Sequence, residues 1–112
     1  MSHGTGMKFD GDKVRMELLI QGMPLALLEI GKVLTFGAEK YAAHSWQFVE
    51  KGKDRYWGAK ERHNLARAMG EKYDPESNLL HLAHEACCIL FLLELELTSL
   101  GEKKNATFEQ TN

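Results

Sequence analysis

The stretch that most constrains the fold is HLAHEACCILFLLELEL, residues 81–97, which is apolar over most of its length but begins with polar side chains. Positions three and four apart share one face of an α-helix, so His81, His84 and Glu85 are expected to lie together at its start. Two glutamates near its end leave an uncharged run shorter than the roughly 20 residues that a membrane span needs. The stretch therefore predicts a core helix with a polar cluster at one end.

Two further helices are predicted from the spacing of apolar residues. The first begins at Pro24, which is tolerated in a first turn, and runs to about residue 42. A loop follows and ends at Asp54, which is a suitable N-cap for the next helix. That helix carries His63 on its apolar face, in a stripe that begins at Tyr56. Three main helices follow from these patterns.

The segments between and beyond these helices are predicted to be turns or tails. YDPESN, residues 73–78, is a turn sequence, and Gly101 is expected to cap the end of the apolar helix. We therefore divide the chain into a lead-in at 1–7, one helical domain at 8–100, and a polar tail at 101–112. The start of the domain is an extended arm with a short helix near Glu17. No pair of strands is predicted, and the fold class is all-α, a bundle of three to four helices.

Composition limits the kinds of partner. Formal net charge is −2 and the basic residues are dispersed, so duplex nucleic acid is not expected as a partner. The adjacent Cys87 and Cys88 point in different directions on a helix, which disfavours a mutual disulfide and fits a reducing cytoplasm. Beyond Cys88 the apolar helix has more apolar surface than two other helices cover. A homo-oligomer, a dimer or a tetramer, is therefore expected.

Four basic and acidic residues in the N-terminal arm form the first candidate site. They are Lys8, Asp10, Lys13 and Arg15. Lysine offers a point charge and arginine a bidentate fork, so the arm is able to fold over a phosphate. The alternative is an arm whose charges are simply solvated, and composition does not decide between them.

The second candidate lies around Gly37. A glycine inside a helical pattern costs roughly 1 kcal/mol relative to alanine, so Gly37 is expected to permit close approach of another helix or of a ligand. Lys40, Tyr41 and Trp46 follow, and an amine with two aromatic rings suits a nucleotide, the rings stacking on the base and the amine meeting phosphate. Tyr41 continues an apolar stripe, which favours a core role for that residue. Trp46, in a loop, is the better ligand candidate.

The third candidate joins Arg62 and His63 to the polar cluster at the head of the apolar helix. Two helices each deliver histidine to inward-facing positions, which is unusual for purely structural residues. Neutral imidazoles with a carboxylate bind a divalent cation, here through His81, His84 and Glu85, and histidine beside arginine equally binds phosphate. The familiar zinc protease spacing is absent. At this point the residues do not decide between a divalent cation and a phosphate as the ligand.

Four blocks of the sequence, in order, resemble one family. They are KFDGDKVRMELL from residue 8, LTFGAEKYAAHSW from residue 34, RH at 62–63 and DPESNLLHLAH from residue 74. Together they resemble the N-terminal-domain family of phage dATP/dGTP diphosphohydrolases, small all-α proteins related to MazG-type nucleotide pyrophosphohydrolases. The resemblance runs from about residue 8 to 95. It implies a MazG-like bundle in the host cytoplasm and no membrane partner.

The resemblance also implies a reaction and roles for the candidate residues. A purine deoxynucleoside triphosphate would be cleaved between its α and β phosphates with help from Mg²⁺ or Mn²⁺, and Trp46 with Tyr41 would hold the base. Phosphates would be bound by Lys13, Arg15, Lys40 and Arg62, and the catalytic or metal cluster would be His63, His81, His84 and Glu85.

The chain departs from the wider MazG pattern, which holds magnesium with two acidic pairs, of the form E-x-x-E and E-x-x-D. Here the second pair aligns with His81 and His84, and the first falls near Arg62 and His63. Because Mg²⁺ prefers oxygen ligands, this indicates another metal, other carboxylates or no metal. The other oxygen donors considered are Glu29, Glu39, Glu61 and Glu85. Two interpretations compete with a hydrolase. The first is a protein that binds and sequesters a nucleotide, including a signalling nucleotide, and the second is a helical assembly protein.

Overall fold

The computed structural model describes the backbone of residues 12–111 and the side chains of residues 12–100. This part of the chain is helical and contains no named strand. The elements are α2 (Met16–Ile20), α3 (Pro24–Lys40), the short 3₁₀ helix η1 (Ser45–Phe48), α4 (Gly52–Ala68) and α5 (His81–Thr111). The all-α class, the short helix near Glu17 and the helix from Pro24 are thereby confirmed.

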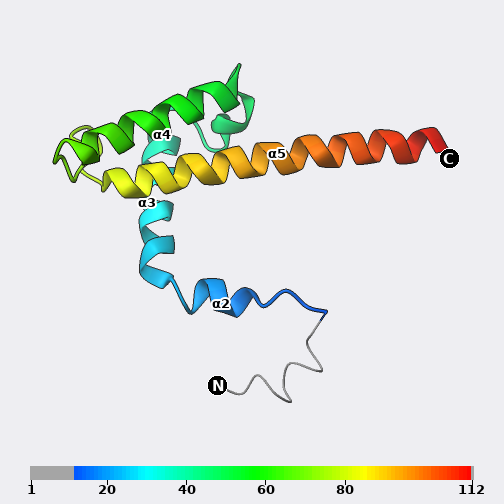
Figure 1. The fold of residues 1–112 in the computed structure, drawn as a ribbon, viewed down its shortest axis with the longest axis horizontal. Coiled ribbons are helices and arrows are strands. Elements are labelled where there is room, and N and C mark those ends of the chain that lie inside the picture. Colours follow the sequence, from blue (N-terminus) through cyan, green and yellow to red (C-terminus); the bar gives the residue numbers. More distant parts are fainter. Residues whose placement is uncertain (1–11, 112) are drawn as a thin grey trace, which may run out of the picture.

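The helices α4 and α5 form the main pair of the fold. Figure 1 shows them side by side and running in opposite directions, with α3 crossing the pair and α2 standing apart at the far end of α3. The helix η1 lies against both α4 and α5. None of the helices in the described part is long and apolar enough to cross a bilayer.

Helix ends differ from the sequence-based expectation at three places. Asp54 is not the N-cap of α4, because the helix begins at Gly52. It lies in the first turn, where its negative charge interacts favourably with the helix dipole. The apolar stripe of the same helix runs to Met69, but the helix ends at Ala68, because Gly70 adopts a φ of 97°, a left-handed conformation typical of helix ends. Gly101 is not a C-cap, because α5 continues through it to Thr111. The domain boundary at residue 100 stays a prediction.

The buried core within the described residues is small. Its apolar members, all buried, are Val33 on α3 and Ala83, Cys87 and Cys88 on α5. Large apolar side chains remain exposed on α3 and α5, among them Leu25, Leu28, Leu34, Ile89, Leu93, Leu97 and Leu100. Exposed apolar side chains that gather on one surface often mark an interface with another protein. The expected homo-oligomer stays a prediction, and this surface is what supports it.

The turn between α4 and α5 folds back on the start of α5. Tyr73 and Leu80 form an isolated antiparallel bridge, and the His81 amide donates to the Lys72 carbonyl at 3.0 Å. Inside the turn, the Asp74 carboxylate accepts the Ser77 amide at 2.8 Å. The predicted turn is confirmed, and these bonds hold its acidic side chains against the first turn of α5.

Candidate functional site

Three histidines meet where the connecting turn folds back, and we call them the histidine cluster: His63 from α4, and His81 and His84 from the first turn of α5. The Nδ1 atoms of His63 and His81 lie 2.8 Å apart. The rings of His63 and His84 are stacked, with centroids 4.6 Å apart and planes 8° apart. His81 is buried, at 3% exposure. The predicted convergence of histidines from two helices is therefore observed.

Side chains of the turn orient the outer nitrogens of these rings. The Nε2 atom of His81 lies 2.7 Å from a carboxylate oxygen of Glu71. The Nε2 atom of His84 lies 2.7 Å from the Ser77 hydroxyl and 3.9 Å from the Asp74 carboxylate. Because a carboxylate only accepts, His81 carries its proton on Nε2 and turns the lone pair of Nδ1 toward His63.

Burial keeps two of the imidazoles uncharged. It is the largest cause that lowers the pKa of His63, followed by the neighbouring His84 and His81. It also lowers the pKa of His84, although the nearby Asp74 carboxylate opposes the shift. Both rings are therefore neutral at pH 7, the form that accepts a proton or ligates a metal.

Glu85 is bound by an arginine on the neighbouring helix. Arg67 Nη2 donates to Glu85 Oε1 at 3.1 Å, and Arg67 Nε donates to the other carboxylate oxygen. Arg67 is the largest cause that lowers the pKa of Glu85, which is only 6% exposed. The carboxylate is therefore ionised and paired with Arg67 across the α4–α5 interface. The expected role of Glu85 as a metal or catalytic group stays a prediction. Arg67 already binds both of the carboxylate oxygens that such a role would need.

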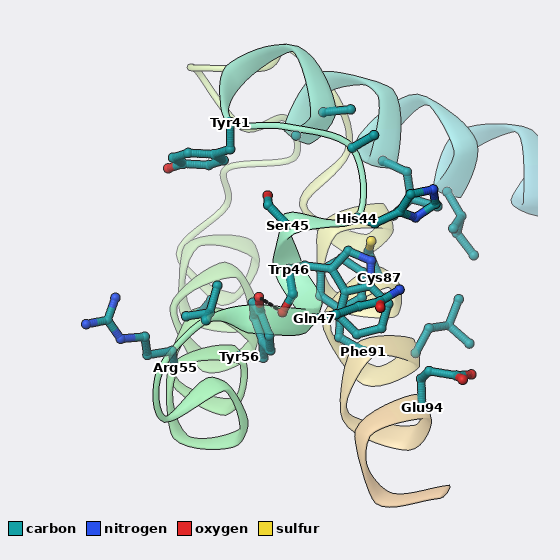
Figure 2. Close-up of a pocket in the computed structure, with 18 of the residues that line it drawn as sticks. Tyr41, His44, Ser45, Trp46, Gln47, Arg55, Tyr56, Cys87, Phe91 and Glu94 are labelled. Atoms are coloured by element: carbon teal, nitrogen blue, oxygen red, sulfur yellow. Dashed lines mark hydrogen bonds between the residues drawn. The ribbon is translucent and has the colours of Figure 1, made fainter. Parts of the chain in front are cut away.

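A second feature is the interhelical cavity, about 1380 Å³ in volume, which lies between α3, η1, α4 and α5 (Figure 2). Its aromatic lining includes Trp46, Tyr56 and Phe91. The Trp46 ring stacks on Phe91 with centroids 4.2 Å apart, and the Tyr56 hydroxyl donates to the Trp46 carbonyl at 2.6 Å. The volume exceeds the roughly 300–1,000 Å³ of most small-molecule sites. The cavity is large enough for a nucleotide.

The cavity and the histidine cluster are adjacent but distinct. No member of the cluster lines the cavity, whereas Arg62, the residue before His63, does. On α4 the cavity residue Ala59 precedes His63 by four positions, and on α5 Cys87 follows His84 by three. One helical turn, about 5.4 Å of rise, thus separates the two features on each helix.

Of the residues predicted around Gly37, Gly37 itself, Tyr41 and Trp46 line the cavity and Lys40 does not, and two expectations are corrected. Tyr41 is 72% exposed, so its expected core role is wrong, and it lines the cavity instead. A Cβ at Gly37 would meet no atom within 4 Å, so Gly37 does not serve close approach of another helix, and the ligand alternative stays open. Lys40 is paired with Glu76 at 2.6 Å and lies 5.2 Å from the Tyr41 ring centroid.

The described part of the N-terminal arm, from residue 12 on, does not line the cavity. Lys8 and Asp10 lie outside the described residues. Lys13 and Arg15 immediately precede α2, which Figure 1 shows apart from α4 and α5, and Arg15 Nε lies 3.0 Å from a carboxylate oxygen of Glu17. A phosphate role for the arm stays a prediction.

Three charged residues of the site were missed in the sequence. Arg67 and Glu71 follow His63 at intervals of four, so helical spacing alone could have placed Arg67 on the same face. Asp74 was interpreted only as a turn residue. Its signal was weaker, because the fold of the turn, rather than a periodic pattern, brings its carboxylate to the cluster.

Comparison with known proteins identifies the family. A family model described as dATP/dGTP diphosphohydrolase, N-terminal, matches residues 3–105. The chain belongs to this family. It is 33% identical over 91 residues to a dATP/dGTP diphosphohydrolase of Salmonella phage PMBT28, and the match covers 81% of this chain but only 30% of that protein. No solved structure matches the chain.

The donor atoms of this dATP/dGTP diphosphohydrolase family member do not fit Mg²⁺. Among the side chains of residues 12–100, one group of possible metal ligands has atoms that all lie within 4.8 Å of one another, namely His63, Asp74 and His81. It offers two nitrogens and one oxygen, whereas Mg²⁺ takes an octahedron of oxygens and Mn²⁺ also prefers oxygen donors. The expected Mg²⁺ or Mn²⁺ cofactor therefore stays a prediction that this cluster does not support.

Proposed function

We propose that the chain binds a purine deoxynucleoside triphosphate, dATP or dGTP, in the interhelical cavity and hydrolyses it to the monophosphate and pyrophosphate. The observation that carries the proposal is the position of an aromatic-lined cavity one helical turn from a cluster of neutral imidazoles. The names of the matched family and of the phage relative support the substrate and the reaction.

The cavity supplies groups for both ends of a nucleotide. The exposed ring of Tyr41 and the stacked rings of Trp46 and Phe91 offer faces for a purine, because every base stacks on an aromatic ring. Arg62 lines the same cavity beside His63, and a guanidinium fork binds phosphate oxygens in pairs. The triphosphate would therefore extend from the aromatic part toward the histidine cluster.

His84 is the residue we assign as general base. Its low pKa keeps it neutral, and the Asp74 carboxylate stabilises the imidazolium that forms when it takes a proton. A water oxygen attacks the α phosphorus and gives its proton to the imidazole. The bond from that phosphorus to the bridging oxygen breaks, and pyrophosphate leaves with the electron pair.

The second candidate function is sequestration of a nucleotide, including a signalling nucleotide, without hydrolysis. It is favoured by one observation: the lining of the cavity contains none of the three clustered histidines. A nucleotide held by the aromatic rings and Arg62 alone needs no catalytic group. The two functions share the cavity and differ only in the fate of the phosphates.

One experiment separates them. The metal-stripped protein is incubated with each dNTP and NTP, with and without Mg²⁺ or Mn²⁺, and the products are resolved by ion-exchange chromatography. Hydrolysis is established if monophosphate and pyrophosphate form, and if this activity is lost in His84→Asn but kept in Lys32→Ala. Lys32 is a suitable control because it pairs with Glu29 on α3 and lines no part of the cavity. Saturable binding of intact nucleotide establishes sequestration. If the protein neither binds a nucleotide nor forms products, both functions are refuted.

A further inference from the structure

We propose that His63, His81 and Asp74 form a binding site for a borderline divalent transition-metal ion of the Zn²⁺ class. This is a different donor set and a different kind of ion from the Mg²⁺ or Mn²⁺ site that the sequence suggested. Such a site would exist whether or not the chain hydrolyses nucleotides.

The contact between the two histidines is the first reason. The Nδ1 atoms of His63 and His81 face each other at 2.8 Å, a distance at which two lone pairs repel unless a proton or a cation lies between them. Glu71 accepts a hydrogen bond from the Nε2–H of His81, which leaves the Nδ1 lone pair of His81 directed at His63. A metal ion that replaced the shared proton would be bound by both nitrogens.

The carboxylate of Asp74 completes the donor set. One of its oxygens lies within 4.8 Å of a ring nitrogen of each histidine, and the Ser77 amide donates a hydrogen bond to the carboxylate at 2.8 Å. Ligand atoms of a tetrahedral zinc site lie about 3.3 Å apart, given metal–ligand distances near 2.0–2.1 Å. The three ligand atoms would therefore have to move by no more than about 1.5 Å relative to one another to reach this spacing. Three protein ligands leave one position open for water or a phosphate oxygen.

The outer partners of the ligands match those of known metal sites. A ligating histidine usually donates its other ring N–H to a carboxylate, which fixes its tautomer and orientation. Glu71 takes this position at His81, and the His84 ring stacks on His63 and holds it from the other side. Glu85 is not part of the set, because Arg67 binds both of its oxygens.

Nitrogen donors select the ion. Imidazole suits Zn²⁺, Co²⁺ and similar ions, whereas Mg²⁺ binds oxygens and gives up its waters reluctantly. An ion here would join α4, the connecting turn and α5 at one point, since His63, Asp74 and His81 come from these three segments. Because the site forms only in the folded chain, bound metal adds to its stability.

The test uses the full chain after treatment with a chelator. Titration with ZnCl₂ in a calorimeter should give one ion per chain, and Co²⁺ should give the visible absorption of a nitrogen- and oxygen-ligated tetrahedral site. The melting temperature should rise with Zn²⁺ but not with millimolar Mg²⁺. These readouts do not involve turnover, so a failure of this site and a failure of the proposed hydrolase are seen separately.

Conservative variants establish the ligands. His63→Asn, His81→Asn and the nearly isosteric Asp74→Asn should each weaken Zn²⁺ binding about a hundredfold or more, and Glu71→Gln by roughly 10- to 100-fold, as outer-shell changes do. His44→Asn removes a histidine outside the cluster and suits its left-handed backbone, so it should bind Zn²⁺ as the native chain does. Equal affinity in all variants, several ions per chain, or no binding at micromolar Zn²⁺ would overturn the proposal. Circular dichroism of each variant separates a lost ligand from a lost fold.

Discussion

Replacing Gly37 with alanine should stabilise the protein and weaken nucleotide binding. Gly37 lies inside α3, and its new methyl group would meet no atom within 4 Å, so the folded chain accepts it without strain. An alanine in a helix interior is about 0.8–1.0 kcal/mol more favourable than a glycine. At roughly 4–8 °C per kcal/mol for a domain of this size, the melting temperature should rise by about 3–8 °C.

The effect on binding follows from the position of Gly37 in the lining of the cavity. A methyl group placed where a ligand packs costs typically 1–3 kcal/mol, which corresponds to a loss of affinity of roughly 5- to 150-fold. The assay is calorimetric titration with dATP and dGTP beside thermal unfolding of the same samples.

Gly31→Ala is the matched control. Gly31 lies in the same helix and also has open space around its missing Cβ, but it does not line the cavity. Both variants should gain similar stability, and only Gly37→Ala should lose affinity. Equal nucleotide affinity in the two variants would refute the assignment of this cavity as the nucleotide site. A fall in melting temperature for Gly37→Ala would show that the space beside it is occupied.

Three further predictions concern pairing, reactivity and assembly. Arg67→Ala should lower the melting temperature at pH 7 more than the control Lys32→Ala, because it strands the buried Glu85 carboxylate. Arg67 lowers the pKa of Glu85 below its ordinary 4.5, so the pair stabilises the fold above that pH. The loss of melting temperature in Arg67→Ala should therefore shrink as the pH falls through the lowered pKa. A loss that stays constant down to acidic pH would contradict this. Burial raises the pKa of Cys87 to about 12, so iodoacetamide at pH 8 should modify it only after unfolding, as mass spectrometry of native and denatured samples would report. In multi-angle light scattering the native chain should exceed the mass of one chain, and Ile89→Lys should reduce that mass; a monomeric native chain would refute the expected homo-oligomer.

Periodic features of the fold were predictable from the sequence. The helices from Pro24 and around His63, and the polar head of α5, follow from apolar spacing, since a helix repeats its faces every three to four residues. Their ends were less predictable. Gly70 ends α4 because a left-handed φ costs glycine little, whereas Gly101 continues in helical conformation although its sequence context is typical of a cap.

The candidate site was predictable only where its residues lie on helices. The meeting of His63 with His81 follows from two helix faces directed at one another. The contribution of Asp74 depends on a turn stabilised by specific hydrogen bonds, for which the sequence offers no periodic signal. Tyr41 was misassigned because its spacing matches a buried stripe, while the space that the stripe faces is a cavity rather than another helix.

The local character of the histidine cluster has a consequence for how the chain opens. The contacts among its histidines and with the turn join residues no more than 21 positions apart, and Phe36 on α3 adds one edge-on ring contact to His84. This hairpin therefore has low contact order and should fold early as one cooperative unit. The helix α3 contributes one buried side chain, Val33, and forms one wall of the interhelical cavity. Amide exchange should therefore release α3 before the hairpin, in a sub-global opening that admits ligand while the cluster stays assembled.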